Sequence, residues 1–349
     1  MYALKRTFFI VMSSLGIIVM LAGCQQTRYP VDHEQLSGEE RLVIRFSHVV
    51  GEDTPKGLAA RRFASLMKER SDGYIEVQVF PNSMLYKDGE EMEALSDNDI
   101  QMIAPATSKV TSIVPEWSVM DLPFAFDSYE EVHAYIKGKT GQELISKLDQ
   151  QGLVMLGMWD NGFKQLTNRD FPINTPIDIK GLNMRIMPSD IIEQQFNLFG
   201  ASAVKLDFDN VFQSLDEGLI DAQENTMSNI TSKSLHYRQE YMTVSNHGYL
   251  GYVLLMNKEF WEDLPDEVRS LIEETLSEVS EWQQEIAHKL NDQELSKLEE
   301  CNCIEITHLS DEEKQQWEEA FSPVYDFYRG RFGAKNINSL PKIKGGNKE

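Results

Sequence analysis

Arg185 lies in the part of this chain whose residue types most clearly suggest chemistry, the stretch from Lys180 to Asn225. Apolar residues occupy every second position from Leu182 to Ile186, and this period of two predicts a strand with one buried face. Arg185 would then project from a rigid element on the opposite face. A guanidinium presents a planar fork of donors that matches a carboxylate and stays charged. Arg185 is therefore a candidate carboxylate anchor, and an ordinary solvated strand arginine is the open alternative.

Two further candidates, His48 and Lys56, follow the first expected strand. Thr54 and Pro55 have the residue types of a helix N-cap and first helical residue, which places Lys56 in the first turn. A cation there opposes the helix dipole, so local stability does not explain it, whereas helix N-termini do bind anions. His48 would lie at the carboxyl end of a strand, where ligands of α/β proteins commonly bind. A structural histidine and a solvated lysine remain the alternatives.

Neither motifs nor charge point to catalysis or to nucleic acid. The chain lacks a Gly-x-Ser-x-Gly elbow, a glycine-rich phosphate loop and a His-Glu-x-x-His helix. The formal net charge is −23, which argues against a nucleic-acid partner because such partners require clustered basic residues. The general field would also repel an anion. An anionic ligand would therefore have to be captured by a few cations in a closed, weakly hydrated cleft.

The elements that must position these side chains alternate between strand and helix. This alternation predicts a mostly parallel sheet between helix layers, and the pattern restarts near Asp178 as a second α/β domain. The expected strands are 42–46, 74–80, 100–104, 153–158, 182–187 and 249–256, and the expected helices are 55–70, 90–95, 129–151, 189–199 and 208–217.

A single long helix is expected after Leu264 and Pro265. The chain contains neither glycine nor proline from there to about Glu300, and its apolar residues keep an approximately helical spacing. About 35 helical residues would reach about 50 Å, longer than one domain. Such a helix must lie across both domains or project from them. A coiled-coil dimer is weakened as an alternative because the spacing does not follow a strict heptad.

The N-terminus predicts secretion. Lys5 and Arg6 precede an apolar run and then Leu-Ala-Gly-Cys at 21–24, so residues 1–23 have the pattern of a signal peptide. The motif Leu-Ala-Gly-Cys at 21–24 has the form of a bacterial lipobox, which implies cleavage before Cys24 and lipidation of the Cys24 thiol. Two acyl chains anchor a protein stably. A plain signal peptide is the alternative, and residues 24–41 are expected to be a tether.

Cys301 and Cys303 are the only other cysteines. No Cys or His grouping has metal-ligand spacing, so no metal site is expected. A disulfide between residues two apart would require a tight loop, and two thiols within a strand is the expected arrangement. Without a disulfide scaffold, stability must come from a core, for which the chain is long enough.

Several segments together resemble one family, the solute-binding proteins of tripartite ATP-independent periplasmic (TRAP) transporters, in its dicarboxylate-binding (DctP-type) branch. Besides 180–225, the segments are Phe-Ser-His-Val-Val at 46–50, 54–57, Phe-Pro-Asn-Ser-Met-Leu-Tyr-Lys-Asp at 80–88, Trp-Asp-Asn-Gly-Phe-Lys at 159–164, and 244–252. The resemblance covers nearly the whole mature chain. One departure is Ala222, where the family usually has glycine.

The resemblance implies an α/β, two-lobed periplasmic-binding-protein-like fold with a long C-terminal helix spanning both lobes. Lobe I would comprise residues 42–161 and 251–290, lobe II residues 162–250 and 291–335, and 336–349 would form a tail. In this family the arginine at 185 grips the ligand carboxylate and Asn225 assists. Lys109 and Lys164 occupy positions near the ligand, with lysine at 164 where many relatives have arginine. Phe208 and Tyr249 are cleft-wall candidates, although core aromatics are commoner.

The function that follows is capture of four-carbon dicarboxylates (succinate, fumarate or malate) for TRAP-type uptake, without cofactor or catalysis. The alternative is a co-sensor that presents a dicarboxylate to a membrane histidine kinase. Both fit a lipid-anchored protein on the outer face of the cytoplasmic membrane, in an organism expected to be Gram-positive.

Overall fold

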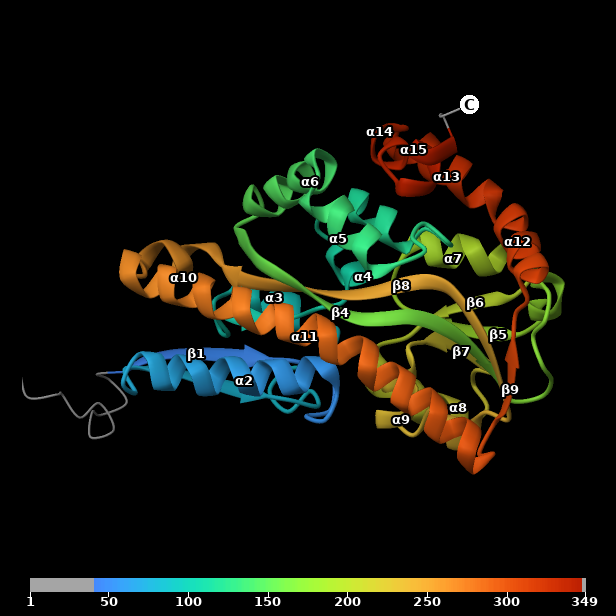
Figure 1. Ribbon diagram of the computed structural model, residues 1–349, viewed down its shortest axis with the longest axis horizontal. Helices are drawn as coiled ribbons and strands as arrows, with labels where there is room; N and C mark the ends of the chain where they lie inside the picture. Colours follow the sequence, from blue (N-terminus) through green and yellow to red (C-terminus); the bar gives the residue numbers. More distant parts are fainter. Residues whose placement is uncertain (1–40, 347–349) are drawn as a thin grey trace, which may run out of the picture.

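The computed structural model describes residues 41–346 (Figure 1). The predicted signal peptide, the lipidation site Cys24 and nearly all of the tether lie outside the described residues. Within them, no helix has the length and apolar character needed to cross a bilayer.

The described strands form one nine-stranded sheet in the order β2-β1-β3-β8-β4-β7-β5-β6, with β9 paired to β8. The strands are β1 (Leu42–Ser47), β2 (Ile75–Phe80), β3 (Met102–Ile103), β4 (Leu153–Asn168), β5 (Asn183–Ile186), β6 (Ser202–Lys205), β7 (Ala222–Asn225), β8 (Tyr241–Asn257) and β9 (Glu305–His308).

Two long strands, β4 and β8, connect the two halves of the sheet (Figure 1). They pair antiparallel with each other, and β4 pairs antiparallel with β7 while β8 does so with β3. The pairs β1–β2, β1–β3, β5–β6 and β5–β7 are parallel. The sheet is therefore mixed, whereas a mostly parallel sheet was expected. The sequence predicted both long strands too short, because polar residues within them, such as Lys164 and Thr243, interrupt the apolar pattern.

Helices cover both faces of this sheet, and α4 to α7 lie on the side of β4 and β8 opposite α2 and α11 (Figure 1). The helices are α2 (Pro55–Arg70), α3 (Glu91–Ser96), α4 (Thr107–Val110), α5 (Tyr129–Lys137), α6 (Lys139–Asp149), α7 (Asp190–Asn197), α8 (Val211–Asp216), α9 (Met227–Ser232), α10 (Lys258–Asp263), α11 (Asp266–Cys301), α12 (Asp311–Ala320), α13 (Ser322–Phe332), α14 (Lys335–Asn338) and α15 (Pro341–Gly346).

Local capping explains several of these boundaries. Helix α2 begins where predicted, because Thr54 accepts the Gly57 N–H at the N-cap and Pro55 fits the first turn. The single helix expected over 129–151 is two helices that meet at Gly138, which is the C-cap of α5 and the N-cap of α6. Its extended backbone (ψ 169°) ends the first helix and starts the second.

Helix α11 has 36 residues and crosses the width of the molecule, as predicted (Figure 1). It packs against α2 in one half of the molecule, against α9 in the other, and against the strand β4 that connects the two halves. Gln283 fixes it to β4, because its side chain accepts the Asp160 N–H and donates to the Asp160 carbonyl. Asn291 makes a second link by donating to the carbonyl of Asn161 at 2.5 Å.

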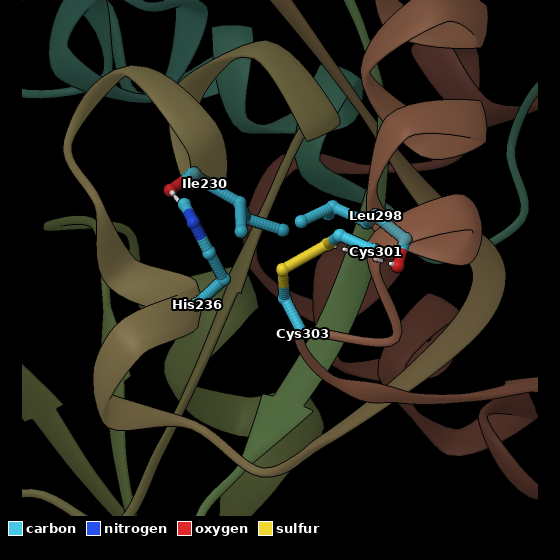
Figure 2. The surroundings of a disulfide bond; sticks show 5 residues. All are labelled: Ile230, His236, Leu298, Cys301 and Cys303. Carbon is cyan, nitrogen blue, oxygen red and sulfur yellow. Dashed lines mark hydrogen bonds between the residues drawn. A yellow bond between two sulfur atoms is a disulfide. The ribbon is translucent and has the colours of Figure 1, made fainter.

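The prediction for the cysteines was wrong. Cys301 and Cys303 form a disulfide, and they do not lie in a strand: Cys301 is the last residue of α11 and Cys303 precedes β9 (Figure 2). Between them Asn302 has φ 49° and ends the helix in the left-handed conformation that asparagine tolerates. Leu298 and Ile304, on either side of the bridge, are buried in a core cluster with Ile230 of α9. The bridge therefore closes the turn between two segments that the core already holds.

The C-terminal residues pack against the body of the molecule. Ile337 and Leu340 are buried, and the carbonyl of Asn336 accepts the Tyr135 hydroxyl at 3.2 Å. Residues 335–343 thus contribute to the core next to α5.

Candidate functional site

The candidate site is a small cavity of about 30 Å³ between the two halves of the sheet. Its walls come from the ends of β1, β5 and β7, from β8, from the starts of α2 and α9, and from the segments around residues 88, 105–109 and 208. The lining residues are Val49, Val50, Lys56, Asp88, Pro105, Ala106, Lys109, Arg185, Met187, Phe208, Asn225, Asn229, Leu250 and Tyr252.

Arg185 projects into this cavity from the middle of β5 and is 1% exposed. Its Nε and Nη2 donate to the carbonyl oxygen of Leu206 at 3.1 and 2.8 Å, which fixes the plane of the guanidinium. Burial lowers the pKa of Arg185, and the nearby carboxylates of Asp88, Glu224 and Asp207 oppose that effect. Since an arginine remains charged in proteins, the cavity contains a buried and oriented cation.

Lys56 reaches the same cavity from the first turn of α2 and is fully buried. Its ammonium donates to the carbonyl of Ala104 at 2.9 Å and lies 3.8 Å from the centroid of the Tyr252 ring. Burial lowers the pKa of Lys56 to about 8, although the carboxylates of Glu91 and Asp88 oppose the shift. Lys56 is thus held in the cavity by backbone and ring contacts, and it titrates near neutral pH.

Lys109 lies at the boundary between the two halves of the cavity. Its ammonium is 2.6 Å from Asp207 and 3.1 Å from Asp88. Asp88 also accepts the backbone N–H of Phe208 at 2.9 Å. Next to these contacts, Asp209 accepts the Ser83 hydroxyl at 2.6 Å and the backbone N–H of Asp88 at 3.1 Å. Residues 83–109 and 207–209 are therefore joined across the mouth of the cavity by several polar contacts.

Asn225 ends β7 beside Arg185 and, at 2% exposed, lines the cavity. Its Oδ1 accepts the backbone N–H of Thr226 at 3.1 Å and Nδ2 of Asn229 at 2.9 Å. Because Oδ1 is occupied by two donors, Nδ2 is the group that Asn225 can offer to an acceptor. This places an amide donor near the guanidinium.

Of the eight predicted ligand residues, the structure brings five together on this cavity: Arg185, Asn225, Lys56, Lys109 and Phe208. The other three, Lys164, His48 and Tyr249, do not line it. Lys164 is buried behind the site, where its ammonium lies 2.6 Å from Glu224. Gly248 leaves room for it, because a Cβ there would lie 2.6 Å from the Lys164 Cε.

His48 and Tyr249 are buried and do not line the cavity. His48 is fully buried, and burial followed by the charge of Lys56 lowers its pKa to about 3, so it is neutral at pH 7. Tyr249 donates its hydroxyl to Asp160 at 2.5 Å, and its ring contacts the edges of Phe126 and Phe163. It packs as a core aromatic. Among the described residues, no three His, Cys, Asp or Glu side chains come close enough to hold a metal ion.

Comparison with known proteins shows the family of this chain. The family model described as "Bacterial extracellular solute-binding protein, family 7" matches residues 46–331. The chain belongs to this family. The C4-dicarboxylate-binding protein DctB of Bacillus subtilis (strain 168) is 44% identical over 313 residues, 90% of this chain and 89% of that protein. The C4-dicarboxylate-binding periplasmic protein DctP of Rhodobacter capsulatus is 40% identical over 302 residues, 86% of this chain and 90% of that protein.

Solved structures of TRAP periplasmic solute-binding proteins have the same fold. The protein from Shewanella oneidensis, with bound succinate, has a TM-score of 0.84 at 37% identity, covering 87% of this chain and 99% of that one. The protein from Pseudomonas aeruginosa PAO1, with bound L-malate, has a TM-score of 0.80 at 36% identity, covering 82% of this chain and 100% of that one. The two-lobed architecture expected from the family resemblance is thereby confirmed.

Nine of the fourteen lining residues of this solute-binding protein were not predicted, and three of the nine have polar side chains: Asp88, Asn229 and Tyr252. Asp88 ends the segment 80–88, which was recognised by its pattern, but no feature of that pattern assigns the carboxylate to the cavity. Tyr252 lies in an apolar run typical of a buried strand. Asn229 follows Asn225 by four residues, a spacing that a helix start would bring together, and this was the one available signal.

Proposed function

We propose that this family 7 solute-binding protein captures a four-carbon dicarboxylate of the succinate, fumarate or malate class. The observation that carries the proposal is the convergence of Arg185, Lys56 and Lys109 on one buried cavity. Lys109 is already paired with Asp88 and Asp207, whereas Arg185 and Lys56 have no carboxylate at ion-pair distance among the described residues, and a diacid would supply two carboxylates. The names of the B. subtilis and R. capsulatus relatives, and the succinate and L-malate in the two solved structures, support this ligand class.

Two places in the cavity fit the two carboxylates. Arg185 uses Nε and Nη2 for the carbonyl of Leu206, so Nη1 takes no part in those bonds and can meet one carboxylate together with Asn225 Nδ2. Lys56 and Lys109 would hold the other. A hydrogen bond to a charged group contributes about 1.5–3 kcal/mol. Three or four such bonds, offset by ordering and desolvation, are consistent with the roughly 8 kcal/mol of a micromolar complex.

Binding would close two lobes around the ligand, with residues 42–161 and 251–290 forming lobe I and 162–250 and 291–335 forming lobe II. Arg185 and Asn225 belong to the second lobe, and Lys56 and Lys109 belong to the first. Only a closed state lets both carboxylates be held at once, so the ligand favours closure. The polar contacts between 83–109 and 207–209 fit such a closed state. The closed complex would deliver its ligand to TRAP membrane subunits.

We also propose that the protein is anchored outside the cell by lipid on Cys24, with residues 24–41 as the tether. The motif Leu-Ala-Gly-Cys at 21–24 supports this. Mass spectrometry of the membrane-extracted protein tests it. A mature N-terminus at an acylated Cys24 is expected, and an unmodified cysteine or a different N-terminus would contradict the anchor.

Isothermal titration calorimetry with succinate, fumarate, malate and a sugar acid tests the ligand class. We expect micromolar binding of the four-carbon diacids and a loss of about tenfold to 100-fold in Arg185→Ala, because the charge-assisted bond from Nη1 disappears. The matched control is Arg169→Ala, which removes an arginine that is about 41% exposed and forms surface ion pairs with Asp170 and Asp221. Undiminished binding by Arg185→Ala, or no binding of any diacid, would contradict the proposal.

A further inference from the structure

Glu91 is a buried carboxyl group next to Lys56 that the proposed binding mode does not use. It is the first residue of α3 and is 2% exposed. Its Oε1 accepts the Ser47 hydroxyl, a neutral donor, at 2.7 Å. A buried carboxylate is costly unless a nearby cation compensates its charge or a proton removes that charge. Glu91 therefore depends on one or the other.

Lys56 is the cation that compensates Glu91. Ser47, which holds Glu91, is the last residue of β1 and pairs with Ile103 of β3. Lys56 donates to the carbonyl of Ala104, the residue after Ile103, so the lysine and Glu91 are attached to neighbouring strand ends. Burial raises the pKa of Glu91 to about 7, and the charge of Lys56 is the largest effect that opposes this rise. Burial also lowers the pKa of Lys56, and there Glu91 is the largest opposing charge.

A bound diacid would change the charge balance around this pair. Four other titratable groups of the described residues interact with it, two carboxyl groups and two neutral rings: Asp88, Asp209, His48 and Tyr252. After burial, the two aspartates add to the rise in the pKa of Glu91, and burial raises the pKa of Tyr252, so its ring stays neutral. A diacid beside Lys56 adds two negative charges. One ammonium cannot compensate both the ligand and Glu91, so Glu91 would be left as a buried excess charge.

We propose that a bound diacid replaces Glu91 as the counterion of Lys56 and that Glu91 then takes up a proton from the solvent. This inference rests on the proposed function and adds a residue outside the cavity lining that links ligand capture to pH. The step forms the O–H bond of a carboxylic acid at Glu91 and breaks no bond in the ligand. Above neutral pH the empty protein holds Glu91 as a carboxylate. Binding must then draw this proton from the solvent, so the affinity falls as the pH rises.

The test counts the protons that accompany binding. Isothermal titration calorimetry with fumarate at pH 8, repeated in phosphate and in Tris, gives this number because the two buffers differ in their heat of ionisation. Both carboxyl groups of fumarate are ionised from pH 6 to pH 9, so the ligand does not titrate. We expect more than one proton to be taken up by the unmodified protein, at Glu91 and Lys56 together, and at most one by Glu91→Gln, at Lys56. Equal numbers in the two proteins would overturn the inference.

The affinity provides a second readout, because glutamine resembles the protonated carboxyl group. Glu91→Gln should bind fumarate as tightly as the unmodified protein at pH 6 and at least about threefold more tightly at pH 9, where the unmodified protein must first protonate Glu91. A purely structural role would instead weaken binding by the same factor at both pH values, and this result would overturn the inference. Glu93→Gln is the matched control, an exposed carboxyl group on the same helix, and should change neither the proton number nor the affinity.

The unmodified protein decides the question if Glu91→Gln does not fold. An uptake above one proton at pH 8 exceeds what Lys56 alone can bind, whereas an uptake of one proton or less would overturn the role of Glu91 and leave dicarboxylate capture intact. Failure of every diacid to bind at any pH would overturn the proposed function itself.

Discussion

Replacing Glu224 with glutamine should destabilise the protein by about 3 kcal/mol at pH 7. Glu224 lies on β7 next to Asn225 and is 1% exposed. Its Oε1 lies 2.6 Å from the Lys164 ammonium, and its Oε2 lies 2.8 Å from Nε2 of His247. Burial alone would raise the pKa of Glu224, but Lys164 and then His247 outweigh it and lower the pKa to about 2.

The magnitude follows from that pKa. A carboxyl that titrates near 4.5 in the unfolded chain and at about 2 in the folded one contributes about 3 kcal/mol at neutral pH, at 1.36 kcal/mol per tenfold change. Removing one partner of a buried ion pair costs about 3–5 kcal/mol, and this range agrees with the value of about 3 kcal/mol obtained from the pKa of Glu224. Because the folded pKa is the lower one, this stabilisation is complete above pH 4.5. It is lost as the pH falls from 4.5 towards 2.

Urea unfolding followed by circular dichroism measures this change, with a matched control at an exposed pair. Asp149 forms an ion pair with Lys258 at 2.9 Å, and its side chain is 55% exposed, so Asp149→Asn should lose at most about 1 kcal/mol. The difference between Glu224→Gln and the unmodified protein should also shrink on going from pH 6 to pH 3. A Glu224→Gln loss below about 1 kcal/mol, or a loss independent of pH, would refute the assigned role of Lys164 and His247 as compensating partners.

Three further outcomes are expected. Because the pKa of Lys56 is lowered to about 8, dicarboxylate affinity should fall on going from pH 7 to pH 9, and calorimetry should show no such fall in Lys56→Met. Asp209→Ala removes the contacts with Ser83 and the Asp88 N–H, and it should weaken ligand binding about tenfold and leave a more open particle in small-angle scattering with ligand. Reducing the Cys301–Cys303 bridge should cost only about 1–2 kcal/mol in urea unfolding, because its loop is so short, and should leave ligand affinity unchanged.

The sequence was sufficient to predict those helices and strands whose signals lie within the element itself. The N-cap at Thr54, the alternation around Arg185 and the uninterrupted apolar spacing of 266–300 each predict an element that the structure contains. It was insufficient to predict features that depend on a strand or side chain far away in the sequence. The full lengths of β4 and β8 depend on their pairing with each other across about 90 residues, and this pairing leaves no local pattern.

The same distinction applies to the site. Arg185 was identified because a guanidinium on a strand can hold a carboxylate and because its segment resembles the family. Lys56 was identified because a cation in the first turn of a helix opposes the helix dipole. Asp88 and Asn229 were missed because their position on the cavity arises only when the two halves of the sheet come together. Lys164 illustrates the converse: it has the residue type of an anion ligand, but its charge is compensated by Glu224 behind the cavity. A residue type predicts a capability, and the tertiary partner decides whether that capability is available to a ligand.

The distribution of charge explains how a chain with a formal charge of −23 can bind a dianion. Exposed carboxylates act through water and salt, and their field falls off within about 8–10 Å. Arg185 and Lys56 are buried at the cavity, so their fields at a bound ligand are screened far less. Lys109 keeps Asp88 and Asp207 beside it, and these carboxylates offset part of the positive charge until a ligand carboxylate competes for the ammonium. The local balance of a few buried groups therefore determines ligand charge, and the net charge of the chain does not.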